Sequence, residues 1–373
     1  MKAFKVAPSI VEYERFSDFA DKARLDGHDL ILTNAYIYDP VIADLNLECQ
    51  ILFQENFGQG EPTDEMVNGI LEALRGMEYD RIIAVGGGTI IDIAKVLAVA
   101  EPKDNVDDMY DRMAGLNKIH PLIIVPTTCG TGSEVTNLSI ISRIKKGVKQ
   151  GLLADAMFAD EAVLIPEMLT SLPYTVFATS SVDAFVHAVE SFLSPNACAL
   201  SEMFSKEAIH LILRGWKESV EEGRKDSWKA HAPVFLRASN FAGIAFGHAG
   251  CAAVHAMAYP LGSVHHIPHG QANLLMFADV MRKYMEKKRG GRLSALSCIL
   301  AKELQVEEKE AFDTLYQLMD DVLPKTHLRD HGITKEELPT FAKNVVETQQ
   351  RLLNNNFVPL SEQEILEIYQ KAF

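Results

Sequence analysis

The hydrophobic pattern changes near residue 166, and this change constrains the fold more than any other feature of the sequence. Before it, short apolar runs rich in β-branched residues alternate with helical patterns, and they cover residues 29–34, 49–53, 81–85, 121–125 and 160–165. Residues 63–74 form one of the helical patterns, with acidic residues in the first turn. Such alternation is typical of βαβ units around a parallel sheet.

After residue 166 the apolar residues recur with a period of about 3.6, and strand-like alternation is nearly absent. The expected helices cover residues 173–193, 199–222, 230–246, 251–259, 293–303, 309–322 and 361–372. A chain of 373 residues exceeds what one hydrophobic core usually supports. We therefore predict an α/β domain of residues 1–166, with a parallel sheet and flanking helices, and an all-helical domain of residues 167–373.

Composition and charge argue against several classes of protein. A net charge of −15 disfavours nucleic acid as a partner, and the basic stretch 282–289 is interpreted as the solvated end of a helix. The five cysteines are scattered and include no Cys-x-x-Cys, which favours a reducing compartment. We see no signal peptide and no uncharged run long enough for a bilayer. We expect a soluble cytoplasmic protein without a membrane partner.

Two loops rich in small residues follow consecutive predicted strands. Residues 86–89 are three glycines and a threonine before a helical pattern, which lets backbone N–H groups approach a phosphate. They lack the third glycine of the Gly-x-Gly-x-x-Gly fingerprint. Residues 126–136 contain five hydroxyl residues and two glycines. Either loop alone fits a tight turn or a hydrated connection, but two at the carboxyl ends of successive strands favour a dinucleotide site.

Four residues of the second half form a candidate metal site. Asp183 and His187 are four positions apart in an apolar helical pattern, so both lie on one face. Such a pair is usually a surface pair, but its valine and phenylalanine neighbours predict burial, and buried polar groups need a partner. His255 in another apolar helix and His269 on a Pro-His-Gly turn supply it. One carboxylate and three imidazoles suit a divalent metal ion.

The charge of this ligand set indicates its chemistry. A divalent ion with one carboxylate keeps a net charge of +1, which lowers the pKa of a bound alcohol. Zinc would accept the four ligands tetrahedrally and Fe²⁺ would take further open positions, so both metals remain open. His265 and His266 are alternatives that could replace a ligand or hydrogen-bond to one.

Taken together, these motifs resemble the iron-containing (group III) alcohol dehydrogenases over essentially the whole chain. The matching segments are residues 86–92, 126–136, 183–187, 242–246, His255 and 268–270. Residues 58–63, 259–262 and 348–355 look most like the members of this family that act on 4-hydroxybutyrate. The resemblance implies a nucleotide-binding α/β domain, a helical domain, a site in the cleft between them and a homodimer.

The resemblance also implies roles for individual residues toward NAD. Gly87, Gly88 and Thr89 would hold the pyrophosphate, Asp92 would contact the nicotinamide carboxamide and Lys149 the nicotinamide ribose. The residues that would line the adenine and ribose side are Thr127, Thr128, Thr131 and Ser133, and Gly86 is a further cofactor-binding candidate. Asn34 stands at the strand end where an acidic residue often binds the ribose 2′-hydroxyl, so NADP remains an alternative.

In the second domain, the resemblance makes Asp183, His187, His255 and His269 the ligands of Fe²⁺, with Zn²⁺ as the alternative. Tyr259 stands where many members carry a histidine assigned to the proton path, so it is a candidate catalytic residue. Its structural alternative is an aromatic core contact.

We therefore expect NAD-dependent interconversion of 4-hydroxybutyrate and succinate semialdehyde, by hydride transfer from a metal-bound alkoxide. Lys149, His265 and His266 are candidates to bind the substrate carboxylate. One alternative is another primary alcohol or diol dehydrogenase of the same family. A lyase resembling dehydroquinate synthase is disfavoured because the metal segments contain few lysines or arginines. The last alternative function is that of a non-catalytic nucleotide-binding oligomer.

Overall fold

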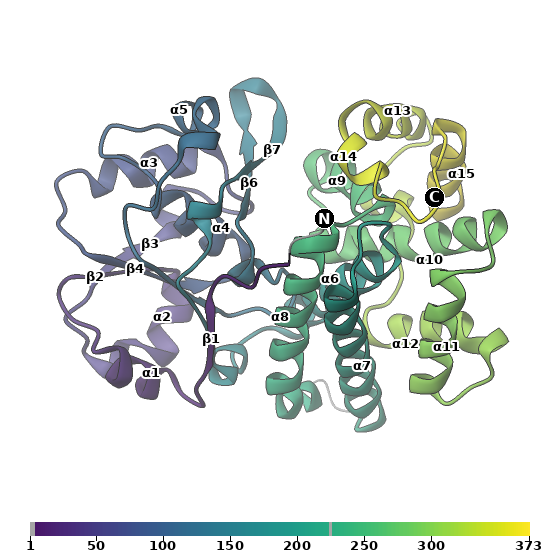
Figure 1. Ribbon diagram of the computed structural model, residues 1–373, viewed down its shortest axis with the longest axis horizontal. Helices are drawn as coiled ribbons and strands as arrows, with labels where there is room; N and C mark the ends of the chain where they lie inside the picture. Colours follow the sequence, from purple (N-terminus) through teal and green to yellow (C-terminus); the bar gives the residue numbers. More distant parts are fainter. Residues whose placement is uncertain (1–3, 224–225) are drawn as a thin grey trace. The chain divides into compact units, whose positions relative to one another are not determined.

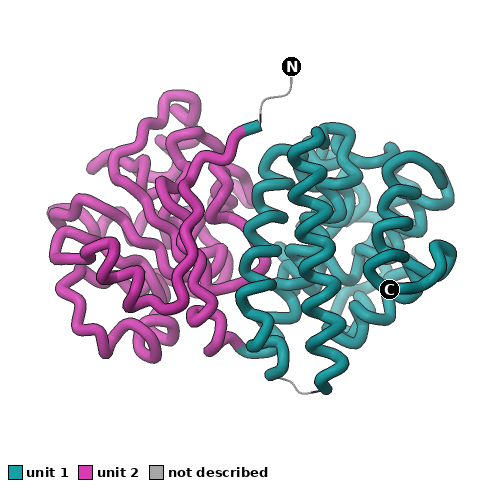
Figure 2. The backbone as a smooth tube through the Cα atoms, turned by 60° about the horizontal axis from the view of Figure 1, so that its bottom comes forward, with its two compact units in different colours: residues 1–4, 173–373 teal, residues 5–172 magenta. Residues whose placement is uncertain are grey.

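The computed structural model describes residues 4–223 and 226–373, which form two compact units (Figure 2). One unit runs from Lys5 to Leu172, and the other contains Phe4 and residues 173–373. The first is built around a parallel sheet and the second is built of helices. This confirms the predicted fold class.

The sheet of the first unit has the strand order β1-β8-β5-β4-β2-β3, and every neighbouring pair is parallel (Figure 1). Its strands are β1 (Ser9–Glu12), β2 (Asp29–Thr33), β3 (Gln50–Phe53), β4 (Arg81–Gly86), β5 (Leu122–Pro126) and β8 (Glu161–Leu164). All except β1 were predicted. β1 is a short strand at the edge of the sheet, and much of it is exposed, so it carries little hydrophobic signal.

Both faces of this sheet are buried, because successive side chains of a strand point to opposite sides. Leu30 and Leu32 of β2 belong to one core, while Ile31 between them belongs to the other. The first core includes residues of α3 (Asp64–Leu74), α4 (Gly88–Leu97) and α5 (Val106–Asp111), and the second those of α1 (Phe16–Ala23) and α2 (Ala35–Val41). Burial on both faces explains the continuous apolar runs of the strands.

An antiparallel hairpin, β6 (Leu138–Arg143) and β7 (Val148–Leu153), forms a second, two-stranded sheet that was not predicted. Its residues Ile141 and Leu152 are fully buried in the core that contains α4. Most other positions of β7 are exposed or half-buried. The hairpin carries Lys149, one of the predicted cofactor residues.

The second unit contains ten α-helices within the residues that the structure describes (Figure 1). They are α6 (Tyr174–Leu193), α7 (Ala199–Glu221), α8 (Ala232–Ala249), α9 (Ala253–His265), α10 (His269–Lys287), α11 (Arg292–Leu304), α12 (Ala311–Val322), α13 (Leu338–Thr348), α14 (Gln350–Leu353) and α15 (Glu362–Ala372). The predicted segments match α6 to α9, α11, α12 and α15. Only the basic end of α10 was predicted, and α13 and α14 were not.

Helix α6 packs against α7, α8 and α10, and most of its residues are buried. Every residue from Ser181 to Leu193 is buried. A helix that is enclosed on all sides is normally apolar all round, and a polar residue on it needs a partner. Asp183, His187 and Glu190 are therefore the residues of α6 whose partners indicate a site.

None of the described helices could cross a bilayer by itself, as judged by length and apolar composition. The segments 227–249 and 253–265, which are bent by 105° relative to each other, pass that test only as a pair. Most residues of α9, the second of these segments, are buried within the helical unit.

Candidate metal centre and nucleotide-binding loops

The two predicted loops lie side by side at the carboxyl edge of the sheet. Gly86 of β4 pairs with Pro126 of β5, and the amide of Thr127 donates a 3.0 Å hydrogen bond to the Gly86 carbonyl. Gly86 has no room for a side chain, because a Cβ atom would lie 2.4 Å from Ile90 Cγ1. Helix α4 therefore turns directly off the end of β4.

The glycine loop also packs against the threonine loop. A Cβ atom on Gly87 would lie 3.2 Å from the methyl group of Thr128, and one on Gly88 would lie 3.0 Å from that of Thr131. Thr89 donates a 3.0 Å hydrogen bond from its hydroxyl to the carbonyl of Gly60. These glycines let the two loops form one small surface beside the first turn of α4, which suits a phosphate.

Asn34 lies at the point where the order of the strands reverses. The chain runs from β2 outward to β3 and then returns to β4, which lies on the other side of β2. The carboxyl ends of β2 and β4 therefore flank the point where the strand order reverses. Open parallel sheets bind ligands at such a point. The buried Asn34 side chain donates hydrogen bonds of 3.2 Å to Gln54 and 2.6 Å to Glu55. A carboxylate therefore stands beside this position although Asn34 itself is neutral.

A buried cluster connects α4 with the threonine loop. Lys95 Nζ is fully buried and donates hydrogen bonds of 2.6 Å to Ser133 Oγ, 2.9 Å to Thr136 Oγ1 and 2.9 Å to the Leu138 carbonyl. Ser133 in turn donates a 2.7 Å hydrogen bond to Asp92, which lies 3.8 Å from the ammonium. We refer to Lys95, Asp92, Ser133 and Thr136 as the Lys95 cluster.

Lys95 was not predicted, although a charged residue three positions after Asp92 on an apolar helix was a usable signal. Burial lowers the pKa of Lys95 to about 8, even though Asp92 and Glu134 favour its charged form. Burial also raises the pKa of Asp92, although Lys95, Ser133, Lys149 and the amide of Ile140 oppose this. Lys149, on β7, pairs with Glu61 at 2.7 Å.

The four predicted metal ligands converge in the helical unit. Asp183 Oδ1 lies 3.9 Å from His187 Nε2 and 3.6 Å from the Nε2 atoms of both His255 and His269. In a tetrahedral site with bonds of about 2.1 Å, neighbouring donors are about 3.4 Å apart. The donors present therefore fit a divalent metal ion with little rearrangement.

The Pro-His-Gly sequence predicted that His269 lies on a turn, and this prediction is wrong. His269 is the first residue of α10, and Pro268 precedes it as the N-cap. A Cβ atom on Gly270 would lie 1.9 Å from the carbonyl oxygen of Thr179, so only glycine lets α10 begin this close to α6. Since Thr179 is one turn before Asp183, this contact brings His269 to its partner.

Glu190 orients His255 from behind. Its carboxylate accepts hydrogen bonds of 2.7 Å from His255 Nδ1, 2.8 Å from the amide of Ala252 and 2.7 Å from the amide of Val254. Because Nδ1 is bound in this way, Nε2 is the nitrogen that faces Asp183. Carboxylates in this position fix the tautomer and the orientation of metal-binding histidines.

Asn273 supports Asp183 in a similar way, since its amide donates a 2.8 Å hydrogen bond to Asp183 Oδ1. Neither Asn273 nor Glu190 was predicted. Spacing could have indicated both, because Glu190 follows His187 by three positions and Asn273 follows His269 by four.

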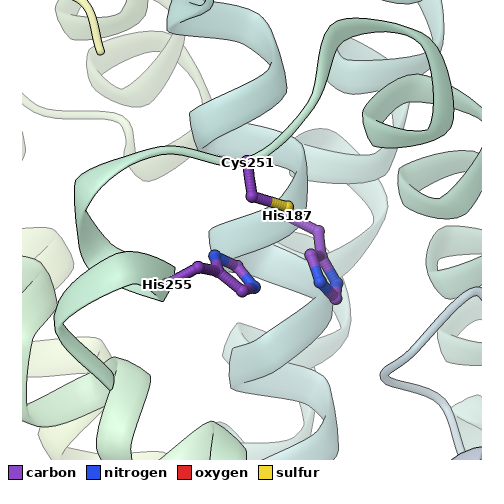
Figure 3. Close-up of side chains that lie close together, drawn as sticks. All are labelled: His187, Cys251 and His255. Carbon is purple, nitrogen blue, oxygen red and sulfur yellow. The ribbon is translucent and has the colours of Figure 1, made fainter. Parts of the chain in front are cut away.

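Cys251 joins this centre, although it was not predicted. Its side chain comes from the segment before α9 and converges with His187 and His255, and their donor atoms all lie within 4.8 Å of one another (Figure 3). The two imidazole rings are stacked with centroids 4.5 Å apart. Burial alone raises the pKa of Cys251, but the charges and hydrogen bonds of His255 and His187 outweigh it and lower the pKa to about 7.

The ligands have correspondingly shifted pKa values. Burial alone raises the pKa of Asp183, but the three histidines around it lower the pKa well below its usual range. Burial lowers the pKa of His255, but Cys251, Asp183 and Glu190 outweigh it and raise the pKa well above its ordinary value. These shifts follow from the short distances between oppositely charged donors.

The remaining predicted residues of this region have different places. The ring of Tyr259 lies 5.9 Å from that of His269, one of the candidate metal ligands. His265 Nε2 lies 2.8 Å from a carboxylate oxygen of Glu337, and His266 is exposed at the left-handed end of α9. His265 and His266 belong to neither donor cluster found among the described residues.

Comparison with known proteins identifies the family. The model of the iron-containing alcohol dehydrogenases matches residues 13–166, and the model of the C-terminal part of this family matches residues 177–373. The chain belongs to the iron-containing alcohol dehydrogenase family. It is an alcohol oxidoreductase, as predicted, and the lyase and non-catalytic alternatives are thereby set aside.

Several relatives in this family are similar over most of their length. The 4-hydroxybutyrate dehydrogenase of Clostridium kluyveri is 44% identical over 373 residues and is covered completely, as is this chain. Long-chain-alcohol dehydrogenase 1 of Geobacillus thermodenitrificans is 35% identical, with 93% of this chain and 89% of that protein covered. The sulfoacetaldehyde reductase of Bilophila wadsworthia is 30% identical, with 84% and 82% covered.

Solved structures of the family share the fold. The sulfoacetaldehyde reductase of Bifidobacterium kashiwanohense, in complex with NAD⁺, superimposes with a TM-score of 0.85 at 22% identity and covers 100% of this chain and 98% of that one. A 1,3-propanediol oxidoreductase gives a TM-score of 0.85 at 23% identity, with both chains fully covered. Membership of this family supports a nicotinamide cofactor and a bound metal.

Proposed function

We propose that this iron-containing alcohol dehydrogenase interconverts 4-hydroxybutyrate and succinate semialdehyde with NAD and a divalent metal ion. The observation that carries the catalytic part is the convergence of Asp183 Oδ1 with the Nε2 atoms of three histidines. The substrate rests on the 44% identity to a 4-hydroxybutyrate dehydrogenase over the whole chain.

We assign Asp183, His187, His255 and His269 as the metal ligands, with Fe²⁺ as the expected ion and Zn²⁺ as the alternative. When bound to such a set, a divalent ion lowers the pKa of an alcohol and polarises an aldehyde. The protein's own contribution is to hold the donors in place. Glu190 orients His255, and Asn273 orients Asp183.

Tyr259 is the proposed proton-transfer residue. It follows His255 by one helical turn, and its ring lies beside His269. A phenol hydroxyl there could pass the proton of the substrate hydroxyl toward solvent during oxidation. Tyr259→Phe should lower kcat and leave the metal content unchanged, whereas Tyr259→His should keep activity and move the pH–rate profile toward neutral pH. A kcat of the Phe variant equal to the wild type would remove Tyr259 from the proton path.

The loops of the first unit would bind NAD. Gly86, Gly87, Gly88 and Thr89 suit the pyrophosphate, while Asp92 and Lys149 would contact the nicotinamide end and Thr127, Thr128, Thr131 and Ser133 the adenine and ribose. Glu55 beside Asn34 supports NAD over NADP, because its carboxylate would repel a 2′-phosphate. The prediction is that Glu55→Gln raises the use of NADPH relative to NADH. An unchanged ratio would contradict it.

The decisive assay compares three aldehydes for NADH consumption. Succinate semialdehyde is expected to react fastest, and butanal, which has the same chain length but no carboxylate, much more slowly. Sulfoacetaldehyde tests whether another anion can replace the carboxylate. Equal rates with butanal and succinate semialdehyde would contradict the carboxylate-specific function and leave a general primary alcohol or diol dehydrogenase.

We further propose that residues 1–166 bind the dinucleotide and residues 167–373 the metal, in a cytoplasmic homodimer. Lys149, His265 and His266 remain the candidates to bind the substrate carboxylate; Lys149 pairs with Glu61 and His265 with Glu337, while His266 is exposed. Light scattering of the purified protein would test the dimer, and the mass of a single chain would contradict it.

A further inference from the structure

Two sets of potential metal donors overlap in the helical unit. Asp183, His255 and His269 form one set, and His187, Cys251 and His255 form the other. His255 belongs to both. Four of these five side chains are the proposed metal ligands, so Cys251 is the one donor-type residue to which the proposed function assigns no role.

The backbone around Cys251 is held rigidly. Asn355 donates hydrogen bonds of 2.7 Å to the Ala249 carbonyl and 3.0 Å to the Cys251 carbonyl, and Glu190 accepts one from the amide of Ala252. Asn355 and Glu190 are themselves buried. The thiol is therefore presented to His187 and His255 by a fixed turn (Figure 3).

We propose that Cys251 is a fifth donor of this centre, whose sulfur coordinates a thiophilic divalent ion together with His187 and His255. The inference rests on the proposed metal centre and adds a ligand to it. A sulfur and a nitrogen on one five-coordinate ion, with bonds of about 2.3 and 2.1 Å and angles of about 90–120°, are about 3.1–3.8 Å apart. The three donor atoms already lie within 4.8 Å of one another, so a small side-chain movement suffices.

Coordination by sulfur changes the charge of the centre. The thiol releases its proton to solvent as the sulfur–metal bond forms. With Asp183 as a second anion the divalent centre becomes neutral, whereas without the thiolate it keeps a net charge of +1. A neutral centre acidifies an alcohol less strongly. Cys251 thereby distinguishes zinc, which favours thiolate, from Fe²⁺, which is satisfied by nitrogen and oxygen.

Cobalt(II) is the probe for this inference, because a cobalt–thiolate bond adds a charge-transfer band in the near ultraviolet. The metal-free full-length protein is titrated with Co²⁺, and the bound metal is counted. We expect one ion per chain with this band, and loss of the band in Cys251→Ser while cobalt stays bound. Cys298→Ser, at an exposed thiol, and Cys49→Ser, at a buried one, are the matched controls and should keep the band.

The outcomes separate this inference from the proposed function. Binding of cobalt to the wild type without the band, or a band that persists in Cys251→Ser, would overturn the fifth donor and leave the metal centre intact. Failure of the wild type to bind cobalt at all would overturn both. A measurement that needs no variant is X-ray absorption of the zinc-loaded wild type, where a sulfur shell at about 2.3 Å is expected and its absence would refute the proposal.

Discussion

The two units each bury a polar cluster, and the clusters differ in the origin of their cation. In the Lys95 cluster the cation is part of the chain: the ammonium of Lys95 donates hydrogen bonds to Ser133 and Thr136 and lies near Asp92. Around Asp183 the chain gathers one carboxylate, three imidazoles and a thiol, all of which are groups that can bind a metal ion. The first arrangement holds two segments together, and the second suits an ion from solution.

Removal of Asp183 should have the largest effect, because it is the point on which the imidazoles converge. Asp183→Asn is expected to lose stoichiometric metal and to lower the reduction of succinate semialdehyde more than about 100-fold, beyond the usual effect of residues that only orient ligands. Metal analysis and NADH consumption measure both. Asp279→Asn, at another buried aspartate of the same unit, is the control and should keep its metal. A metal-replete Asp183→Asn would contradict the site.

In the Lys95 cluster, the substitution that corresponds to Asp183→Asn is Asp92→Asn, which leaves the buried Lys95 without its nearest carboxylate. The expected cost is about 3 kcal/mol in the free energy of unfolding, because an uncompensated buried charge is unfavourable. Urea denaturation measures it. Adding Lys95→Met should recover part of the loss, since no buried ammonium then remains.

The exposed Asp21→Asn serves as the control for the Lys95 cluster and should be nearly neutral. If Asp92→Asn is as stable as the wild type, the hydroxyl groups alone satisfy Lys95. The cluster would then owe its stability to hydrogen bonds rather than to the ion pair.

Glu190→Gln should have a smaller effect on the metal centre. An amide cannot accept hydrogen bonds from His255, Ala252 and Val254 as a carboxylate does, so His255 loses its fixed orientation. We expect metal affinity about 10–100-fold weaker, measured by competition with a chelator. Ser191→Ala, at the next residue of α6, should leave the affinity unchanged. Equal affinities would show that Glu190 only builds the turn before α9.

The sequence predicted the central strands because they are buried on both faces and therefore apolar throughout. It did not predict β1, a short edge strand, or the β6–β7 hairpin, where exposed positions break the apolar pattern. Helix α9 was predicted to end near Tyr259, but it continues through Pro260 to His265. Tertiary packing there outweighs the tendency of proline to end a helix.

In the candidate metal site, helical spacing predicted which residues lie together, but residues placed by tertiary contacts were not predicted. Asp183 and His187 could be paired because their separation is helical. Cys251 could not be predicted as part of the site, because the position of its backbone depends on a hydrogen bond from Asn355, which is 104 residues further along the chain. His269 was predicted on a turn because no local signal shows that Gly270 packs against Thr179.

The most gradual expected effect is a pH dependence that belongs to the Lys95 cluster. Burial lowers the pKa of Lys95 from 10.5 to about 8 in the folded protein. Between these values the unfolded chain binds the proton and the folded one does not, so this group makes the free energy of unfolding rise with pH. The rise is at most about 1.4 kcal/mol per pH unit.

Urea denaturation of the wild type and of Lys95→Met at several values between pH 7.5 and about 10 tests this contribution, because titrating groups away from the Lys95 cluster affect both proteins alike. The stability of the wild type relative to the variant should increase across this range. A constant difference would mean that Lys95 keeps its proton when folded, with an ordinary pKa. The Lys95 cluster would then contain a permanently charged cation, and its contrast with the donors around Asp183 would be sharper still.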